Sequence, residues 1–228
     1  MTRITEQLLH LNSRIADAAS AAGRKRDAID ILGVSKKHSA ESVKKASSAG
    51  ITRFGENYVQ EAIEKIPLIG EDLEWHFIGR IQSNKTRLIA ENFAWVQTVS
   101  NERIAARLDR QRPANMAPLQ ICIQVCLDPD NIHSGVRAEE LSPLCEFVAT
   151  RSNLRLRGLM GMPLPADDFD AQRRPFRELR TYMEDLNQQG YDLDTLSMGM
   201  SGDLEAAVHE GSTLLRIGTA LFGPRNGI

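Results

Sequence analysis

Short apolar runs alternate with amphipathic stretches along the whole chain. The runs are rich in β-branched and aromatic residues, and runs of this length predict buried strands. We interpret as strands residues 29–34, 53–55, 74–79, 95–99, 119–125, 154–162, 195–200 and 214–217. Between the runs, apolar residues recur at steps of three and four, which predicts helices that bury one face. We interpret as helices residues 4–22, 40–49, 56–61 and onward, 83–90, 101–111, 138–150, a long stretch through 176–186 that ends at Gly190, and 203–209.

Strands that alternate with helices predict a parallel sheet with crossover helices. Eight such units in a chain of 228 residues predict a closed (β/α)8 barrel that forms one domain over residues 1–228. The first helix precedes the first strand, so we expect an extra helix that covers the barrel. The alternative is an open doubly wound sheet. No Gly-x-Gly-x-x-Gly motif follows the first strand, which disfavours the dinucleotide-binding version of that fold.

Composition narrows the classes of function. Hydrophobic residues make up 42% of the chain and charged residues 25%, and the net charge is −2, so no strong field attracts nucleic acid. No apolar run approaches the roughly 20 residues of a membrane span, and residues 1–12 lack the apolar segment of a signal peptide. Cys122 and Cys126 share one predicted strand and would lie about 13 Å apart, too far for a disulfide. We therefore expect a cytoplasmic protein.

Lys36 is the first candidate for chemistry. It follows the first predicted strand, and the C-terminal ends of barrel strands carry the active sites of this fold. A lysine at that position is partly desolvated, which disfavours the ammonium form and leaves more neutral amine to attack an aldehyde. The alternative is that Lys36 simply ends the strand and reaches water.

A phosphate site is expected after the seventh and eighth strands, where barrels of this kind often bind phosphate. Met200-Ser201-Gly202 and Gly218-Thr219 occupy these two loops and offer two hydroxyl groups and several backbone N–H donors. We call Ser201, Gly202, Gly218 and Thr219 the phosphate corner. The alternative is a capped helix and a tight turn. The charge of Asp203 would repel phosphate, unless its side chain caps the following helix on the side away from the ligand.

An imine-forming lysine beside a phosphate site suggests pyridoxal 5'-phosphate, which also needs a partner for its ring nitrogen. Arg216 is the candidate partner, because a guanidinium only donates hydrogen bonds and would keep the ring nitrogen unprotonated. A salt bridge at a strand end is the alternative for Arg216. Asn57 and His76 are further candidates, with a helix cap and a hydrogen-bonded core histidine as their alternatives. The chain has no metal-ligand spacing and no Gly-x-Ser-x-Gly elbow.

Six motifs in order resemble the pyridoxal phosphate homeostasis protein family over nearly the whole chain. They are Val34-Ser35-Lys36, Phe54-Gly55-Glu56-Asn57-Tyr58-Val59-Gln60-Glu61, Trp75-His76-Phe77-Ile78-Gly79, Gln82-Ser83-Asn84-Lys85, Ser197-Met198-Gly199-Met200-Ser201 and Arg216-Ile217-Gly218-Thr219-Ala220-Leu221-Phe222-Gly223. The resemblance implies the fold of the alanine racemase N-terminal barrel and a Schiff base at Lys36. It also implies phosphate held by Ser201, Thr219 and nearby backbone, Arg216 facing the ring nitrogen, and a role in handling the cofactor without established turnover.

The chain departs from this family at three positions. Gly202 stands where a polar or acidic residue is frequent, and His38 and His133 stand where lysines are frequent. Because these lysines are secondary cofactor contacts in that family, the resemblance does not extend to a second cofactor site or a transfer route here.

Two functions follow from these residues, and we expect the first. A carrier would hold pyridoxal phosphate on Lys36 and exchange it with the cell's pool, with PLP-dependent apoenzymes as partners. An amino-acid racemase would need an acid or base on each face of the substrate α-carbon. We expect no β-rich second domain like the one that supplies a tyrosine in alanine racemase, and Tyr58, Tyr182 and Tyr191 are not obvious replacements. Its absence also removes one dimer interface, which favours a monomer. A ligand-free scaffold is the third interpretation.

Overall fold

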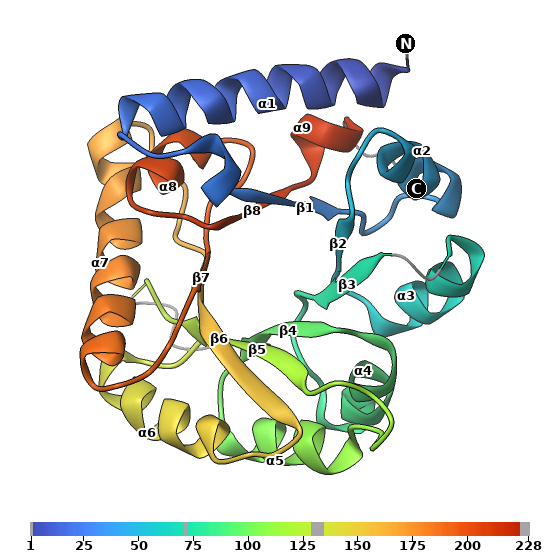
Figure 1. Ribbon diagram of the computed structural model, residues 1–228, viewed down its shortest axis with the longest axis vertical. Helices are drawn as coiled ribbons and strands as arrows, with labels where there is room; N and C mark the ends of the chain where they lie inside the picture. Colours follow the sequence, from blue (N-terminus) through green and yellow to red (C-terminus); the bar gives the residue numbers. More distant parts are fainter. Residues whose placement is uncertain (1, 71–72, 129–134, 224–228) are drawn as a thin grey trace.

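The computed structural model describes residues 2–70, 73–128 and 135–223. Its strands form a closed barrel in sequence order, and every neighbouring pair is parallel. Figure 1 shows the strands around the centre with the helices outside them. The strands are β1 (Asp30–Val34), β2 (Arg53–Glu56), β3 (Glu74–Phe77), β4 (Trp95–Val99), β5 (Leu119–Val125), β6 (Leu154–Gly161), β7 (Thr195–Ser197) and β8 (Leu214–Ile217). The predicted (β/α)8 barrel is confirmed, and the open sheet is wrong.

The number of residues paired between neighbouring strands varies around the barrel. β5 and β6 share seven residue pairs with one register shift, whereas β7 and β8 share only the pair Ser197 and Leu214. β1 closes the barrel against β8 in a register that sets Leu32 beside Arg216. Lys36 and Arg216 therefore arise from adjacent strands, although they lie 180 positions apart in the chain.

The helices surround this barrel because each buries its apolar stripe against the strands. They are α1 (Arg3–Ala21), α2 (Ala40–Ser48), α3 (Val59–Lys65), α4 (Thr86–Asn92), α5 (Glu102–Gln111), α6 (Ala138–Ala149), α7 (Phe169–Gln188), α8 (Leu204–His209) and α9 (Thr219–Phe222), with 3₁₀ turns η1 (Arg26–Ala28), η2 (Ile66–Leu68) and η3 (Ser83–Lys85). No described helix is long and apolar enough to cross a membrane.

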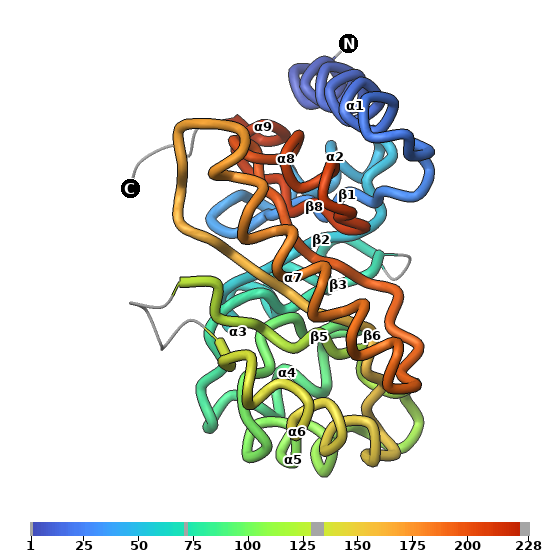
Figure 2. The backbone as a smooth tube through the Cα atoms, turned by 90° about the vertical axis from the view of Figure 1, so that its left-hand side faces the viewer, coloured from blue at the N-terminus to red at the C-terminus, as the bar shows by residue number. Residues whose placement is uncertain are grey.

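The first helix packs outside the barrel beside α8 and α9, as both views show (Figures 1 and 2). Leu8, Leu11 and Ile15 form its buried stripe. Arg14 of α1 forms a bidentate ion pair with Glu205 of α8, with N–O distances of 2.8 and 2.9 Å. The expected cover by an extra N-terminal helix is therefore confirmed.

Three of the differences between the predicted and the observed elements lie near the site. The helix expected from residue 56 begins at Val59, because Glu56 still pairs with Phe77 in the sheet. The strand expected through residue 200 stops at Ser197, because Gly199 turns the backbone with φ +95. The short helix α9, which follows β8 directly, was not predicted.

Candidate functional site

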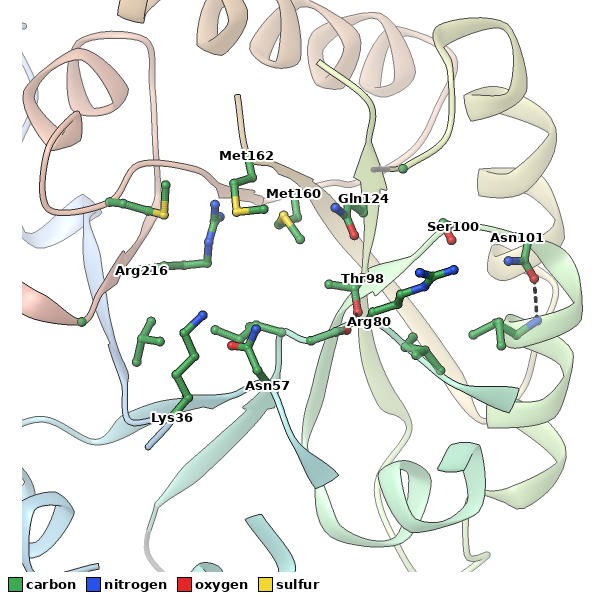
Figure 3. Close-up of a pocket in the computed structure, with 18 of the residues that line it drawn as sticks. Lys36, Asn57, Arg80, Thr98, Ser100, Asn101, Gln124, Met160, Met162 and Arg216 are labelled. Carbon is green, nitrogen blue, oxygen red and sulfur yellow. Dashed lines mark hydrogen bonds between the residues drawn. The ribbon is translucent and has the colours of Figure 1, made fainter. Parts of the chain in front are cut away.

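A cavity of about 930 Å³ opens at the C-terminal ends of the strands, where the fold places its sites. Seven of the eight predicted site residues line it: Lys36, Asn57, Met200, Ser201, Arg216, Gly218 and Thr219. Figure 3 shows Lys36, Asn57 and Arg216 directed into the same space from different strands. The barrel thus brings together groups from the two ends of the chain.

Lys36 sits on a tight turn between β1 and α2. The Ser35 N–H donates to the Gly55 carbonyl at 3.0 Å, which extends the sheet pairing by one residue, and the His38 N–H donates back to the Ser35 carbonyl at 3.0 Å. Lys37 adopts a left-handed conformation with φ +62, which few residues other than glycine do. The turn leaves Lys36 half-buried at the cavity wall.

A cluster of three charged side chains, Glu56, Glu61 and Lys65, hydrogen-bonds to the residues of this turn. Lys65 of α3 donates to the Ser35 carbonyl at 3.0 Å, to Glu56 at 2.7 Å and to Glu61 at 2.8 Å. Glu56 also accepts the Ser35 hydroxyl at 2.7 Å, and Glu61 accepts the Lys37 N–H at 2.6 Å. Burial raises the pKa of Glu56, although Lys65 and Ser35 oppose that rise. The cluster therefore fixes the backbone on both sides of Lys36.

The phosphate corner is assembled by contacts between the last two loops. The Ser201 hydroxyl accepts the Ala220 N–H at 3.2 Å, which joins the β7 loop to α9. Asp203 does not cap α8 with its side chain, so that expectation is wrong. Its carboxylate instead accepts the Met200 N–H at 2.5 Å. Burial raises the pKa of Asp203, against the opposing influence of Arg216.

Arg216 is almost fully buried, with 5% of its surface exposed. Its guanidinium donates to the Ser197 carbonyl at 2.5 Å, to the Ser197 hydroxyl at 2.9 Å and to the Gly161 carbonyl at 2.9 Å. Burial lowers the pKa of Arg216 to about 10, while Asp203 acts in the opposite direction. The guanidinium therefore stays charged at neutral pH. It forms no direct salt bridge with any residue that the structure describes, which contradicts the salt-bridge alternative for Arg216.

His76 requires a correction, because it lies in the barrel interior and not among the residues that line the cavity. Its Nδ1 faces the Gln97 amide nitrogen at 2.8 Å, and its Nε2 faces Glu74 at 2.9 Å. Its ring also stacks on Trp95. Burial lowers the pKa of His76, which keeps the ring neutral. His76 reaches the site only through Gln97, whose amide oxygen accepts the Ser197 hydroxyl at 2.6 Å.

Several site residues were missed by the sequence analysis. Gln97 is a polar residue with an amide side chain inside the predicted strand 95–99, and that position was the signal that could have revealed it. Lys65 was not considered in the sequence analysis, and Glu61 appeared there only as part of a motif, although the two side chains lie four residues apart on α3 and form an ion pair. His38 is half-buried and stacks on Phe222 of α9 with ring centroids 4.7 Å apart, whereas His133 lies outside the described residues.

The fold and the lysine-bearing cavity define the class of this protein. A family model described as alanine racemase, N-terminal domain, matches residues 8–226, and the chain belongs to that family. Alanine racemase of Clostridium difficile shares the fold at 17% identity, with a TM-score of 0.72 over 96% of this chain and 57% of that one.

Closer relatives place the chain within the family. The pyridoxal phosphate homeostasis protein of Pseudomonas aeruginosa is 50% identical over 99% of this chain and 97% of its own. That of Escherichia coli (strain K12) is 44% identical over 99% and 98%. PipY of Synechococcus elongatus, solved with PLP bound, is 35% identical with a TM-score of 0.85 over 97% of this chain and all of that one. The chain is a member of the pyridoxal phosphate homeostasis protein family.

Proposed function

We propose that this protein holds pyridoxal 5'-phosphate on Lys36 and exchanges it with the cellular pool. The observation that carries the proposal is the shared cavity, in which the Lys36 amine, the Arg216 guanidinium and the two hydroxyls of the phosphate corner all line one space. The homeostasis proteins above and the PLP-bound PipY structure support the same ligand.

The residues present fit this cofactor. An aldehyde needs a primary amine, a phosphate needs hydrogen-bond donors, and the ring nitrogen needs a polar partner. Lys36 supplies the amine, the phosphate corner supplies the hydrogen-bond donors, and Arg216 supplies the partner of the ring nitrogen. The Asn57 side-chain oxygen is buried without a hydrogen-bond partner among the described residues, so it can accept a proton donor from the ligand. Among residues 2–70, 73–128 and 135–223, no aspartate or glutamate that would repel phosphate lines the cavity.

Each residue has a distinct task in this proposal. The Lys36 nitrogen forms a C–N link to the aldehyde carbon, and water leaves. Ser201 and Thr219 orient the phosphate, and Arg216 donates to the ring nitrogen and keeps it unprotonated. Bound pyridoxal phosphate supplies an electron sink for amino-acid chemistry, and a partner that stays a guanidinium weakens that sink. The arrangement therefore favours storage and release over turnover.

The second candidate, an amino-acid racemase, needs a second acid or base opposite the lysine. The residues that line the described cavity include no tyrosine, histidine, cysteine or carboxylate. Tyr58 is 53% exposed at the start of α3, and Tyr182 hydrogen-bonds to Glu178 on α7. These placements support a carrier. We propose in addition that it acts as a monomer and that PLP-dependent apoenzymes receive the cofactor. We also propose that it works in the cytoplasm, where cysteines such as the buried Cys122 and Cys145 stay reduced.

Borohydride reduction of the PLP-loaded protein, followed by peptide mass spectrometry, tests the lysine assignment. We expect one reduced adduct on Lys36, its complete loss in Lys36→Ala, and no change in Lys44→Ala, whose lysine is exposed on α2. An adduct that persists on another lysine of Lys36→Ala would refute the assignment. Incubation of the loaded protein with L-alanine separates the two functions, since steady accumulation of the D-isomer would establish a racemase.

A further inference from the structure

The cavity around Lys36 extends beyond the residues that the cofactor needs. Lys36 and Arg216 lie at one end, and Ser100 and Asn101 lie at the other (Figure 3). Cavities of about 300–1,000 Å³ hold drug-sized ligands, and this one, at about 930 Å³, is near the upper limit. Pyridoxal phosphate is a single-ring molecule, so a cofactor held at the Lys36 end leaves the other end to a second ligand or a second part of one.

The far end is formed by the loops after β3 and β4 and by the first turn of α5. Arg80 follows β3, and Arg103 lies in that first turn. The residues that line this end are Arg80, Ile81, Ser83, Ser100, Asn101, Arg103 and Ile104. Two guanidinium groups and several polar side chains thus surround a small apolar surface made by Ile81 and Ile104.

The charges that line the cavity do not balance. Arg80, Arg103 and Arg216 are cationic, and none of the lining residues that the structure describes is acidic. Arg216 is fixed by carbonyl and hydroxyl groups and has Asp203 nearby. Arg80 and Arg103 are exposed, and neither forms a salt bridge with a carboxylate in residues 2–70, 73–128 or 135–223. Ser201 belongs to the loop after β7, whereas Arg80 and Arg103 come from the loop after β3 and from the first turn of α5.

We infer that Arg80 and Arg103 form a second oxyanion subsite in this cavity, which takes the carboxylate or phosphate group of a small molecule. A guanidinium presents its N–H groups as a fork that matches either oxyanion with two parallel hydrogen bonds. Ser100 and Ser83 add hydroxyl groups, and Ile81 contacts the apolar part of the ligand. The inference rests on the proposed function only for assigning the Ser201 end to the cofactor.

Titration of the PLP-loaded protein by calorimetry tests the subsite, because loading fills the phosphate corner. Succinate and inorganic phosphate are the two probes, and sodium chloride keeps the ionic strength constant. We expect saturable binding of at least one probe; binding of succinate alone assigns a carboxylate ligand, and binding of phosphate alone assigns a phosphate ligand.

Matched variants decide whether the two arginines are responsible. Arg80→Met and Arg103→Met should each weaken probe binding by about tenfold or more, since a hydrogen bond to a charged group contributes about 1.5–3 kcal/mol. Arg110→Met is the control, because this arginine is exposed on α5 outside the cavity. The reduced Lys36 adduct should form equally in all three variants. Absence of saturable binding, or binding that survives in the Arg80→Met/Arg103→Met double variant, would overturn the subsite, and intact adduct formation would leave the cofactor assignment standing.

Discussion

The sharpest test of how Lys36 is positioned is the substitution Lys65→Met. Lys65 is 6% exposed, and its ammonium bonds to Glu56, Glu61 and the Ser35 carbonyl. Methionine matches the stem of lysine but removes the charge and leaves the fully buried Glu56 carboxylate without its cation. Breaking a buried ion pair by removing one partner costs about 3–5 kcal/mol. We expect the free energy of unfolding to fall by about that amount.

The loss of unfolding free energy in Lys65→Met should depend on pH, and the ionisation of Glu56 sets the direction of that dependence. Burial already raises the pKa of Glu56 in the folded protein, so its ionisation lowers stability as the pH rises from the unfolded-state value to the folded-state value. Loss of Lys65 raises the pKa of Glu56 further and widens this interval. The deficit of Lys65→Met should therefore be largest at neutral pH and shrink as the pH falls toward about 4, near the unfolded pKa of glutamate.

Urea denaturation followed by the fluorescence of Trp75 and Trp95 measures these free energies. Lys45→Met is the matched control, because Lys45 pairs with Glu41 at 2.7 Å on the exposed face of α2. Exposed pairs of this spacing contribute about 0.3–0.5 kcal/mol. The double variant Lys65→Met/Glu56→Gln should recover much of the loss, since it removes the unpaired charge. A deficit below about 1 kcal/mol, or one that does not change with pH, would show that the cluster is not the strong constraint described above.

The remaining predictions concern Arg216 and two glycines of the loop after β7. Arg216→Ala should weaken cofactor binding and shift the absorbance of the loaded protein without abolishing the Lys36 adduct; unchanged absorbance and affinity would rule out Arg216 as the ring partner. Gly199→Ala should destabilise the protein by about 1–3 kcal/mol, because φ is +95 and an added Cβ would lie 2.5 Å from the Cβ of Ala207. Gly202→Ala, which meets no atom within 4 Å, should change the free energy of unfolding by no more than about 0.5 kcal/mol. Equal denaturation midpoints for the two glycine variants would contradict this interpretation.

The sequence predicted the barrel because its signals are local and repeat. Each strand is a short apolar run, each helix has its own stripe, and parallel strands joined by helices have few ways to close. It also predicted that Lys36, Ser201, Arg216 and Thr219 lie on one rim, since the C-terminal ends of all strands in a parallel barrel point the same way. That rim is where the structure places them.

The rest depended on contacts between residues far apart in the chain. The sequence left two interpretations of His76 open, a site residue or a hydrogen-bonded core histidine, and the barrel turns it toward Gln97 and Glu74 in the interior. Lys65 has the sequence pattern of a surface residue, and only the packing of α3 against β2 buries its ammonium beside Glu56. The side-chain direction of His76 and the burial of Lys65 are set by neighbouring strands and helices. Sequence spacing therefore determined which rim the site occupies, and tertiary packing decided which polar groups reach it.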